Sequence, residues 1–208
     1  MKGAFSYRVS KPATWREPSA ASVLDGYLKP RDFQLPPEPA TENMIELPFV
    51  GVAGQALRGG QETELLPECG GEVTPDTFMT VGGITKPGIS MHPPYKKGVG
   101  YVFLRYAIEL PKKDVMFRAF VGKPDYKLGN GDGTLYQIAV QPAGAAISER
   151  KILASAQVKE KKWNALEADL SPWRGKKVWL YLIADVGPAD SSDCDGSAWG
   201  GLELKAKR

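Results

Sequence analysis

Oxygen-bearing side chains gather at two glycine-rich points of this 208-residue sequence, GNGDG at 129–133 and DSSDCDG at 190–196. Carboxylate and amide oxygens at such close spacing suit a hard cation such as Ca²⁺. Neither segment fits an EF-hand loop, because aligning its Asp and Gly residues with positions three, five and six leaves no carboxylate at positions one and twelve. A plain structural turn is the simpler interpretation of each segment, and an irregular loop that binds a structural Ca²⁺ ion is the alternative. The expected ligands are Asn130, Asp132, Asp193 and Asp195.

His92 is the single histidine of the chain. A chain with one histidine cannot form a metal site that needs two imidazoles of its own. The neighbouring Pro93 and Pro94 predict that His92 lies in a rigid loop. Two roles are open: the ring packs the loop and donates to a carbonyl group, or it binds a sugar hydroxyl. The sequence also lacks a P-loop, a G-x-S-x-G elbow, an H-E-x-x-H helix and a dinucleotide fingerprint. No common catalytic signature is therefore present.

Five Trp and eight Tyr are the chemically suggestive aromatic residues. The apolar faces of sugar rings stack on aromatic planes while the sugar hydroxyls seek fixed polar partners. Trp163, Trp173 and Trp199 fall at expected strand edges or turns, whereas Trp179 lies inside a buried-looking run. A pair of carboxylates could instead perform glycoside hydrolysis, but no spacing among the 24 acidic residues singles out such a pair.

Charge and hydropathy exclude several classes of partner. The net charge of +3 arises from 27 basic and 24 acidic residues that are mostly intermixed, so we expect no nucleic-acid partner. No apolar run reaches about 18 residues, so we expect no membrane insertion. The first residues lack an apolar run long enough for a signal peptide, so we expect that export would depend on a signal that was removed or that belongs to a longer parent protein. Cys69 and Cys194 could form a disulfide, stay as free thiols, or bind outside the chain.

The elements that must position these residues are mostly short strands. Residues 1–43 form a Pro-rich N-terminal arm or linker, and residues 44–208 form the folded domain, with 54–71 expected as a loop. Alternating apolar residues predict strands at 99–110, 115–121 and 136–140, and the run at 176–186 predicts a central strand covered on both faces. Weaker strands at 78–81, 88–92, 152–156, 164–170 and 198–204 bring the count to about nine. Ser171 to Gly175 is the one expected helical turn, with Ser171 as its N-cap. We therefore expect an all-β, jelly-roll-type antiparallel β-sandwich with a Pro-rich N-terminal extension.

Three segments of residues 83–204 carry a family resemblance, namely GITKPGISMHPP at 83–94, FRAFVGKPDYKLGNGDGTLYQIAV at 117–140 and LIADVGPADSSDCDGSAWGGLEL at 182–204. Together they resemble the NPCBM (novel putative carbohydrate-binding module) family. The chain departs from the family pattern where Asp125 comes one residue late, where Cys194 replaces a frequent His, and where Gly201 replaces an Asp. The resemblance implies a carbohydrate-binding rim made by His92, Asp125, Tyr126, Asp185, Asp193 and Trp199.

The family also implies a function, which we state as an expectation. The chain would be a non-catalytic module that binds a galactose-like sugar or a plant or microbial polysaccharide. It would be accessory to a glycoside hydrolase, associated with other domains of that parent enzyme, and extracellular or periplasmic. Two alternatives stay open: a polysaccharide hydrolase or lyase that uses a carboxylate pair, and a protein-assembly or adhesion module that docks through residues 1–43.

Overall fold

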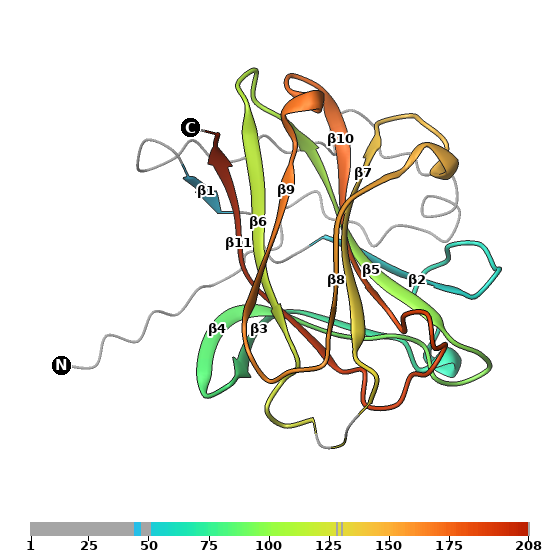
Figure 1. The fold of residues 1–208 in the computed structure, drawn as a ribbon. Coiled ribbons are helices and arrows are strands. Elements are labelled where there is room, and N and C mark those ends of the chain that lie inside the picture. The colour runs from blue at the N-terminus through green and yellow to red at the C-terminus, as the bar shows by residue number, and fades with distance from the viewer. Residues whose placement is uncertain (1–43, 47–50, 128, 130, 208) are drawn as a thin grey trace.

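The protein is built from two antiparallel sheets packed face to face (Figure 1). The computed structural model describes residues 44–46, 51–127, 129 and 131–207. The first sheet has the order β3 (Glu72–Val81), β4 (Ile84–His92), β11 (Ser197–Ala206), β6 (Val115–Gly122) and β9 (Asn164–Asp169), with β1 (Met44–Glu46) paired to β11. The second sheet has the order β2 (Val52–Leu57), β5 (Gly100–Glu109), β10 (Lys177–Asp185), β7 (Thr134–Pro142) and β8 (Lys151–Val158). The expected all-β sandwich is confirmed.

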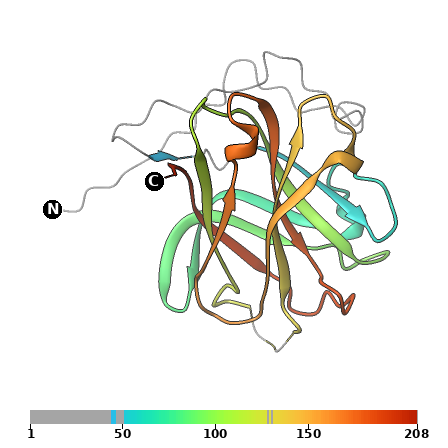
Figure 2. The same ribbon diagram turned by 45° about the horizontal axis from the view of Figure 1, so that its top comes forward.

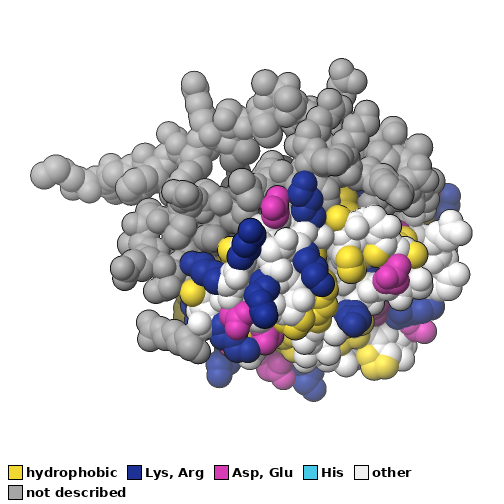
Figure 3. All heavy atoms as spheres, turned by 90° about the horizontal axis from the view of Figure 1, so that it is seen from above, with side chains coloured by type: hydrophobic (Ala, Val, Ile, Leu, Met, Phe, Trp, Pro, Cys, Tyr) yellow, Lys and Arg dark blue, Asp and Glu magenta, His cyan; other side chains and the backbone are white. Residues whose placement is uncertain are grey.

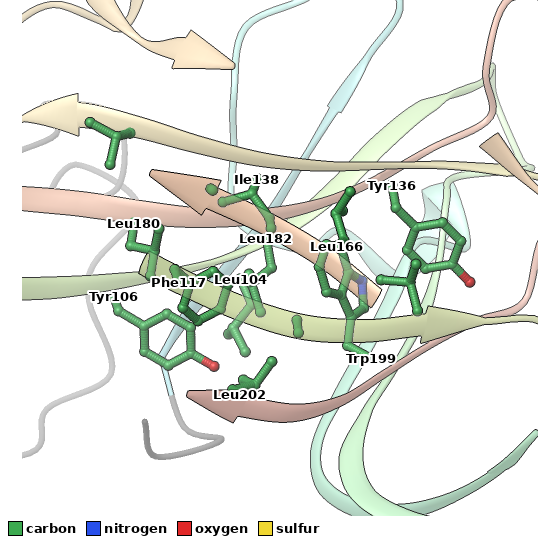
Figure 4. Packing of buried hydrophobic residues seen from close by; sticks show 14 of the residues in the cluster. Leu104, Tyr106, Phe117, Tyr136, Ile138, Leu166, Leu180, Leu182, Trp199 and Leu202 are labelled. Atoms are coloured by element: carbon green, nitrogen blue, oxygen red, sulfur yellow. The ribbon is translucent and has the colours of Figure 1, made fainter. Parts of the chain in front are cut away.

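The core between the sheets follows from the alternation in the sequence. Successive side chains of a strand point to opposite faces, so an alternating strand buries every second residue. In β5 the residues that face the core between the sheets are Val102, Leu104, Tyr106 and Ile108, which pack in one cluster with residues such as Phe117 of β6. Figure 4 shows Leu104, Tyr106 and Phe117 among the side chains that fill the space between the two layers. Burial of this apolar surface is the main stabilising contribution to the fold.

Strand β10 is covered on both faces, as its unbroken apolar run predicts. Leu180 and Leu182 lie in the core between the sheets, whereas Trp179, Tyr181 and Ile183 lie in a separate buried cluster on the other side of the second sheet. Strand β10 also pairs with a neighbour along each edge, β5 on one side and β7 on the other. Its position in the middle of the sheet explains why it has no polar face.

Several expectations about individual elements need correction. Residues 52–57, of which 54–57 were expected in a loop, form strand β2, which pairs with β5. The strands at 115–122 and 134–142 follow one another in sequence but belong to different sheets, so their connection crosses from one layer to the other. Arg105 lies on the face of β5 that is opposite Val102 and Leu104, and it is only 2% exposed.

The expected helical turn is present as a single 3₁₀ turn, η4 (Ser171–Trp173). Its N-cap is Leu170, however, and not Ser171. The backbone N–H of Ser171 donates to the Asp169 carboxylate at 2.9 Å, so the side chain that helps to fix this turn lies two residues before Ser171. The other short turns are η2 (Pro67–Cys69) and η3 (Ile147–Glu149).

The connections between strands gather at two ends of the sandwich, as the two ribbon views show (Figures 1 and 2). Within the part of the chain that the structure describes, no helix is long and apolar enough to span a membrane. The expected N-terminal arm at 1–43 lies outside the described residues. Cys69 and Cys194 are both free thiols.

Candidate functional site

Three connections meet at one end of the sandwich, and we call this region the loop face. It comprises the end of β4 with the following loop (90–97), the start of the β6–β7 connection (123–127), and the β10–β11 connection (186–196). Glycines show how closely they pack: a side chain at Gly131 would collide with the Asp193 carbonyl, and one at Gly196 would collide with the Lys127 side chain. The segments carrying the sequence-predicted rim residues are therefore neighbours in space.

His92 ends strand β4 and is partly buried. Its Nδ1 lies 2.7 Å from the Pro93 carbonyl oxygen, which fixes Nδ1–H as the donor and leaves Nε2 as the acceptor. The ring meets Tyr95 edge-on, with the ring centroids 5.1 Å apart. Burial lowers the pKa of His92, and the nearby Lys127 ammonium lowers it further against the opposing effect of Pro93 and Glu72. The imidazole is thus a neutral ring with one nitrogen suited to accept from a hydroxyl group.

Two tyrosines stand out from this end of the molecule. Tyr126 is 60% exposed and Tyr95 is 46% exposed. The Tyr126 hydroxyl lies 3.1 Å from the Ser90 hydroxyl, which ties the ring to strand β4. Tyr95 packs against Gly70, where any side chain would collide with the tyrosine ring. Both rings are exposed aromatic planes held by the framework of the sheet.

Asp125 fastens two connections together. One carboxylate oxygen accepts from the Gly82 N–H at 2.7 Å and the other from the Gly83 N–H at 2.8 Å. Its own N–H donates to the Thr80 carbonyl at 2.9 Å. These two amide bonds lower the pKa of Asp125. Through these bonds Asp125 joins the β3–β4 turn to the β6–β7 connection, and its expected role as a sugar ligand stays a prediction.

Asp185 is also engaged within the chain. Its carboxylate accepts from the Arg58 guanidinium at 3.1 and 3.2 Å and from the Gly187 N–H at 2.7 Å. Arg58 also binds the exposed Asp190. Asp185 is 6% exposed, which corrects its expected role as a sugar ligand. It holds the start of the β10–β11 connection against the end of strand β2.

Trp199 was expected at the rim but lies in the core. It is 0% exposed and packs edge-on against Tyr136 with centroids 5.3 Å apart. Figure 4 shows its ring between the two sheets beside Leu166. The physical reason is its register in β11: Trp199 pairs with Ile89 and Val121, whose side chains also point into the core. A sugar ring therefore has no access to it.

Asp132 and Asp195 form a buried pair of carboxylates beneath the loop face. All four of their carboxylate oxygens are buried without a hydrogen-bond partner in the described structure. Asp195 is 0% exposed, and burial, followed by the charge of Asp132, raises its pKa to about 8. The Lys123 ammonium opposes this shift and donates to the Gly129 carbonyl at 2.7 Å. Unpartnered buried carboxylates are costly, so this pair needs a proton or a cation.

The other expected metal ligands do not complete a set of side chains at this pair. Asp193 is exposed, and its carbonyl rather than its carboxylate faces Gly131. Asn130 lies outside the described residues. Among the residues that are described, no group of three or more His, Cys, Asp or Glu side chains is placed to hold a metal ion. Further ligands would have to be backbone oxygens, the Asn130 amide or water.

A second polar cluster, on the other side of the second sheet, escaped the sequence analysis. Glu62 accepts from Tyr101 at 2.9 Å and pairs with Arg150, and Arg105 donates to the Tyr181 hydroxyl at 2.9 Å. Burial, followed by the charge of Glu62, raises the pKa of Tyr101 to about 12. The only local signal was an arginine in an otherwise apolar strand. These groups bind one another, which favours a structural role.

Comparisons with known proteins find remote structural likenesses. No family model and no curated protein matches it. The xylan-binding module CBM15 is 10% identical, with a TM-score of 0.48 over 80% of this chain and 99% of that one. The CBM51 of a Clostridium perfringens GH95 protein, solved with methyl-galactose, is 18% identical, with a TM-score of 0.42 over 64% of this chain and 88% of that one.

A third similar structure is longer than this chain. The CBM22-1–GH10 part of Clostridium thermocellum xylanase 10B, solved with xylohexaose, is 14% identical, with a TM-score of 0.42. The match covers 80% of this chain but only 28% of that one. All three proteins contain modules whose names are those of carbohydrate-binding families. At these identities and TM-scores the likeness assigns no ligand to this chain.

Proposed function

We propose that this chain is a non-catalytic glycan-binding module whose binding site is the loop face. The observation that carries the proposal is the pair of exposed, framework-held rings of Tyr95 and Tyr126 beside the Nε2 acceptor of His92. Such a site stacks a sugar ring and orients its hydroxyls. The proteins reported above, which were solved with xylohexaose or methyl-galactose, are consistent with this function but do not decide it.

The wider context belongs to the same proposal. The module would be accessory to a glycoside hydrolase in a longer parent protein and would act outside the cytoplasm on a galactose-like sugar or a polysaccharide. A shallow site of this kind buries little area, so its affinity is modest and becomes useful through linkage to an enzyme. The resemblance to NPCBM modules in residues 83–204 motivates this context.

The test is binding by calorimetry and glycan array, with Tyr126→Ala as the main variant. Losing the stacked ring should weaken binding by about tenfold or more, since base or sugar stacking on one aromatic ring contributes roughly 1–3 kcal/mol. Ile152→Ala is the matched control, because Ile152 is 54% exposed on β8 of the other sheet. Equal affinity of the Tyr126→Ala variant and the unaltered chain would refute the proposed site.

The buried carboxylate pair bears on the hydrolase alternative. A glycosidase needs two carboxyl groups that flank an accessible glycosidic bond. The oxygens of Asp132 and Asp195 are buried, so a sugar chain cannot reach between them. The pair therefore gives no support to hydrolysis. The assembly alternative depends on residues 1–43, which lie outside the described part of the chain.

We infer instead that Asp132 and Asp195 hold a structural Ca²⁺ ion. Two buried carboxylates without hydrogen-bond partners match the hard oxygen ligands that this cation prefers. The ion would supply positive charge to a site where two carboxylates meet and would tie the β6–β7 connection to the β10–β11 connection. The residues present fit that role, and they fit it better than the exposed Asp193 carboxylate does.

A further inference from the structure

Lysines at the loop face are paired with aromatic rings. Lys96 Nζ lies 5.2 Å from the centroid of the Tyr95 ring, and Lys127 Nζ lies 5.6 Å from that of Tyr126. Within the described residues neither ammonium takes part in an ion pair. A ring attracts the cation without neutralising its charge. Each exposed tyrosine therefore presents a positive charge beside its aromatic plane.

The opposite end of the molecule is arranged differently. There Arg174 pairs with Asp114 at 3.1 Å and Lys207 with Asp169 at 2.6 Å. Figure 3 looks at this end and shows many basic side chains, some of which lie beside acidic ones. Two basic residues at that end are paired within the chain, whereas among the described residues neither Lys96 nor Lys127 at the loop face pairs with an acidic side chain.

Acidic side chains at the loop face are largely engaged. Asp125 accepts from two backbone amides, and Asp185 and Asp190 both bind Arg58. The remaining exposed acids are Glu72, opposite His92 in the β3–β4 ladder, and Asp193. Lys96, Lys97 and Lys127 outnumber these two. Over residues 90–97, 123–127 and 186–196 as a whole, four lysines are balanced by four aspartates, so the positive charge is confined to the tyrosine–lysine pairs.

Strand β4 sets the spacing of the two tyrosine–lysine pairs. Ser90, which binds Tyr126, and His92, which packs against Tyr95, lie two residues apart and so point to the same face about 7 Å from each other. The Lys127 stem rests on Gly196, which fixes the direction of its ammonium. The rings of Tyr126, His92 and Tyr95 therefore lie along one face, with a lysine ammonium beside each tyrosine. This arrangement suits a chain of sugars that carries negative groups at regular intervals.

We propose that the glycan bound at the loop face is anionic, carrying carboxylate or sulfate groups on its sugars. This inference rests on the proposed function, because it names the class of glycan for the same site. The tyrosine rings stack the sugars, and Lys96 and Lys127 bind the acidic groups. Exposed charges of this kind also make the affinity fall as salt rises.

The test is affinity electrophoresis and calorimetry of the whole chain with three probes, namely polygalacturonate, chondroitin sulfate and neutral galactan. We expect an acidic probe to bind at least about tenfold more tightly than galactan at low salt, and to lose this advantage at high salt. The double variant Lys96→Gln/Lys127→Gln should lose about tenfold for the acidic probe and little for galactan. Lys113→Gln is the control, because it removes one charge in the exposed β5–β6 turn at the opposite end.

Each result separates the two proposals. Binding of polygalacturonate alone or of chondroitin sulfate alone supports the inference and identifies the acidic group. Binding of galactan as tight as that of the acidic probes overturns the inference but leaves the glycan-binding function standing. Acidic binding that survives the double variant, or that falls equally in Lys113→Gln, overturns the inference as nonspecific attraction. No binding to any glycan would overturn both.

Discussion

Asp side chains at the loop face differ mainly in whether their oxygens already have partners. The family resemblance implied sugar ligands at Asp125 and Asp185, and residue type and spacing suggested a metal ligand at Asp195. Asp125 instead binds amides 43 and 42 residues away in sequence, and Asp185 binds an arginine 127 residues away. Such partners are set by the tertiary fold, so no local pattern could have predicted them. Asp195 alone of the three is buried with both carboxylate oxygens unpartnered among the described atoms.

Asp195 leads to a prediction about calcium and pH. Because burial raises its folded pKa to about 8, above the usual 3.8, the native state binds more protons than the unfolded state between these values. In chelator, the contribution of Asp195 to stability is therefore present at low pH and is lost as pH rises towards 8. Calcium should remove this loss. Calcium at one hundred times its Kd should raise the free energy of unfolding by about 2.7 kcal/mol. This corresponds to a Tm rise of roughly 5–10 °C for a chain of this size.

The measurement is thermal unfolding at pH 5 and pH 8, with calcium and with chelator. Asp195→Asn keeps the shape of the side chain but removes its charge, so both the pH dependence in chelator and the response to calcium should shrink. Asp114→Asn makes the same chemical change at an exposed position and should keep both responses. A calcium response that persists in Asp195→Asn would place the ion elsewhere or show that binding is nonspecific.

At the scale of elements, the alternation of apolar residues in the sequence predicted where strands lie, but it did not predict which strands pair with one another. Alternation located the strands at 100–109 and 115–122, but the division into two sheets depends on contacts between residues far apart in sequence. Strand β2 was missed because its sequence VAGQAL is small and weakly alternating, and it is stabilised by pairing with β5. The β3–β4 turn also depends on a distant contact. Gly82 and Gly83 adopt positive φ angles of 58° and 74° there, as a tight turn requires, but the two glycines do not show which residue stabilises the turn.

Asp125 is that residue, and it gives a prediction for the β3–β4 turn. Asp125→Ala should raise the hydrogen-exchange rates of the Gly82 and Gly83 amides at least severalfold, because each loses its carboxylate acceptor. Asp125→Asn keeps one acceptor and should have an intermediate effect. The pKa of Asp125 is lowered, so the contact is complete at neutral pH and is lost only as pH falls through that lowered value.

Exchange measured by NMR or mass spectrometry checks this prediction. Asp190→Ala is the control, because Asp190 is an exposed acid of the β10–β11 connection that binds Arg58 rather than the turn. Unchanged exchange at Gly82 and Gly83 in Asp125→Ala would show that the turn is held without Asp125.

At the scale of the whole molecule, the two faces of each sheet determine which aromatic residues can meet a ligand. The sequence placed Trp199 near a glycine-rich connection, which suggested an exposed ring. Its register in β11 places it in the core instead, opposite Tyr136. Tyr95 and Tyr126 lie in connections outside the ladder, so the same sandwich leaves them exposed. The aromatic residues available for binding are thus those in the connections, because the aromatic residue in strand β11 is buried in the core.

Trp199 therefore should matter for stability and not for binding. Trp199→Ala should lower the free energy of unfolding by about 3–5 kcal/mol, the usual cost of removing a fully buried large aromatic residue. Trp199→Phe should cost less, because it keeps most of the packing and removes an indole N–H that is buried without a partner among the described residues. Urea unfolding measures both changes. Under conditions where each variant is fully folded, glycan affinity should equal that of the unaltered chain, whereas Tyr126→Ala should lose affinity without losing stability. Loss of affinity in folded Trp199→Phe would mean that the core tryptophan reaches the ligand after all.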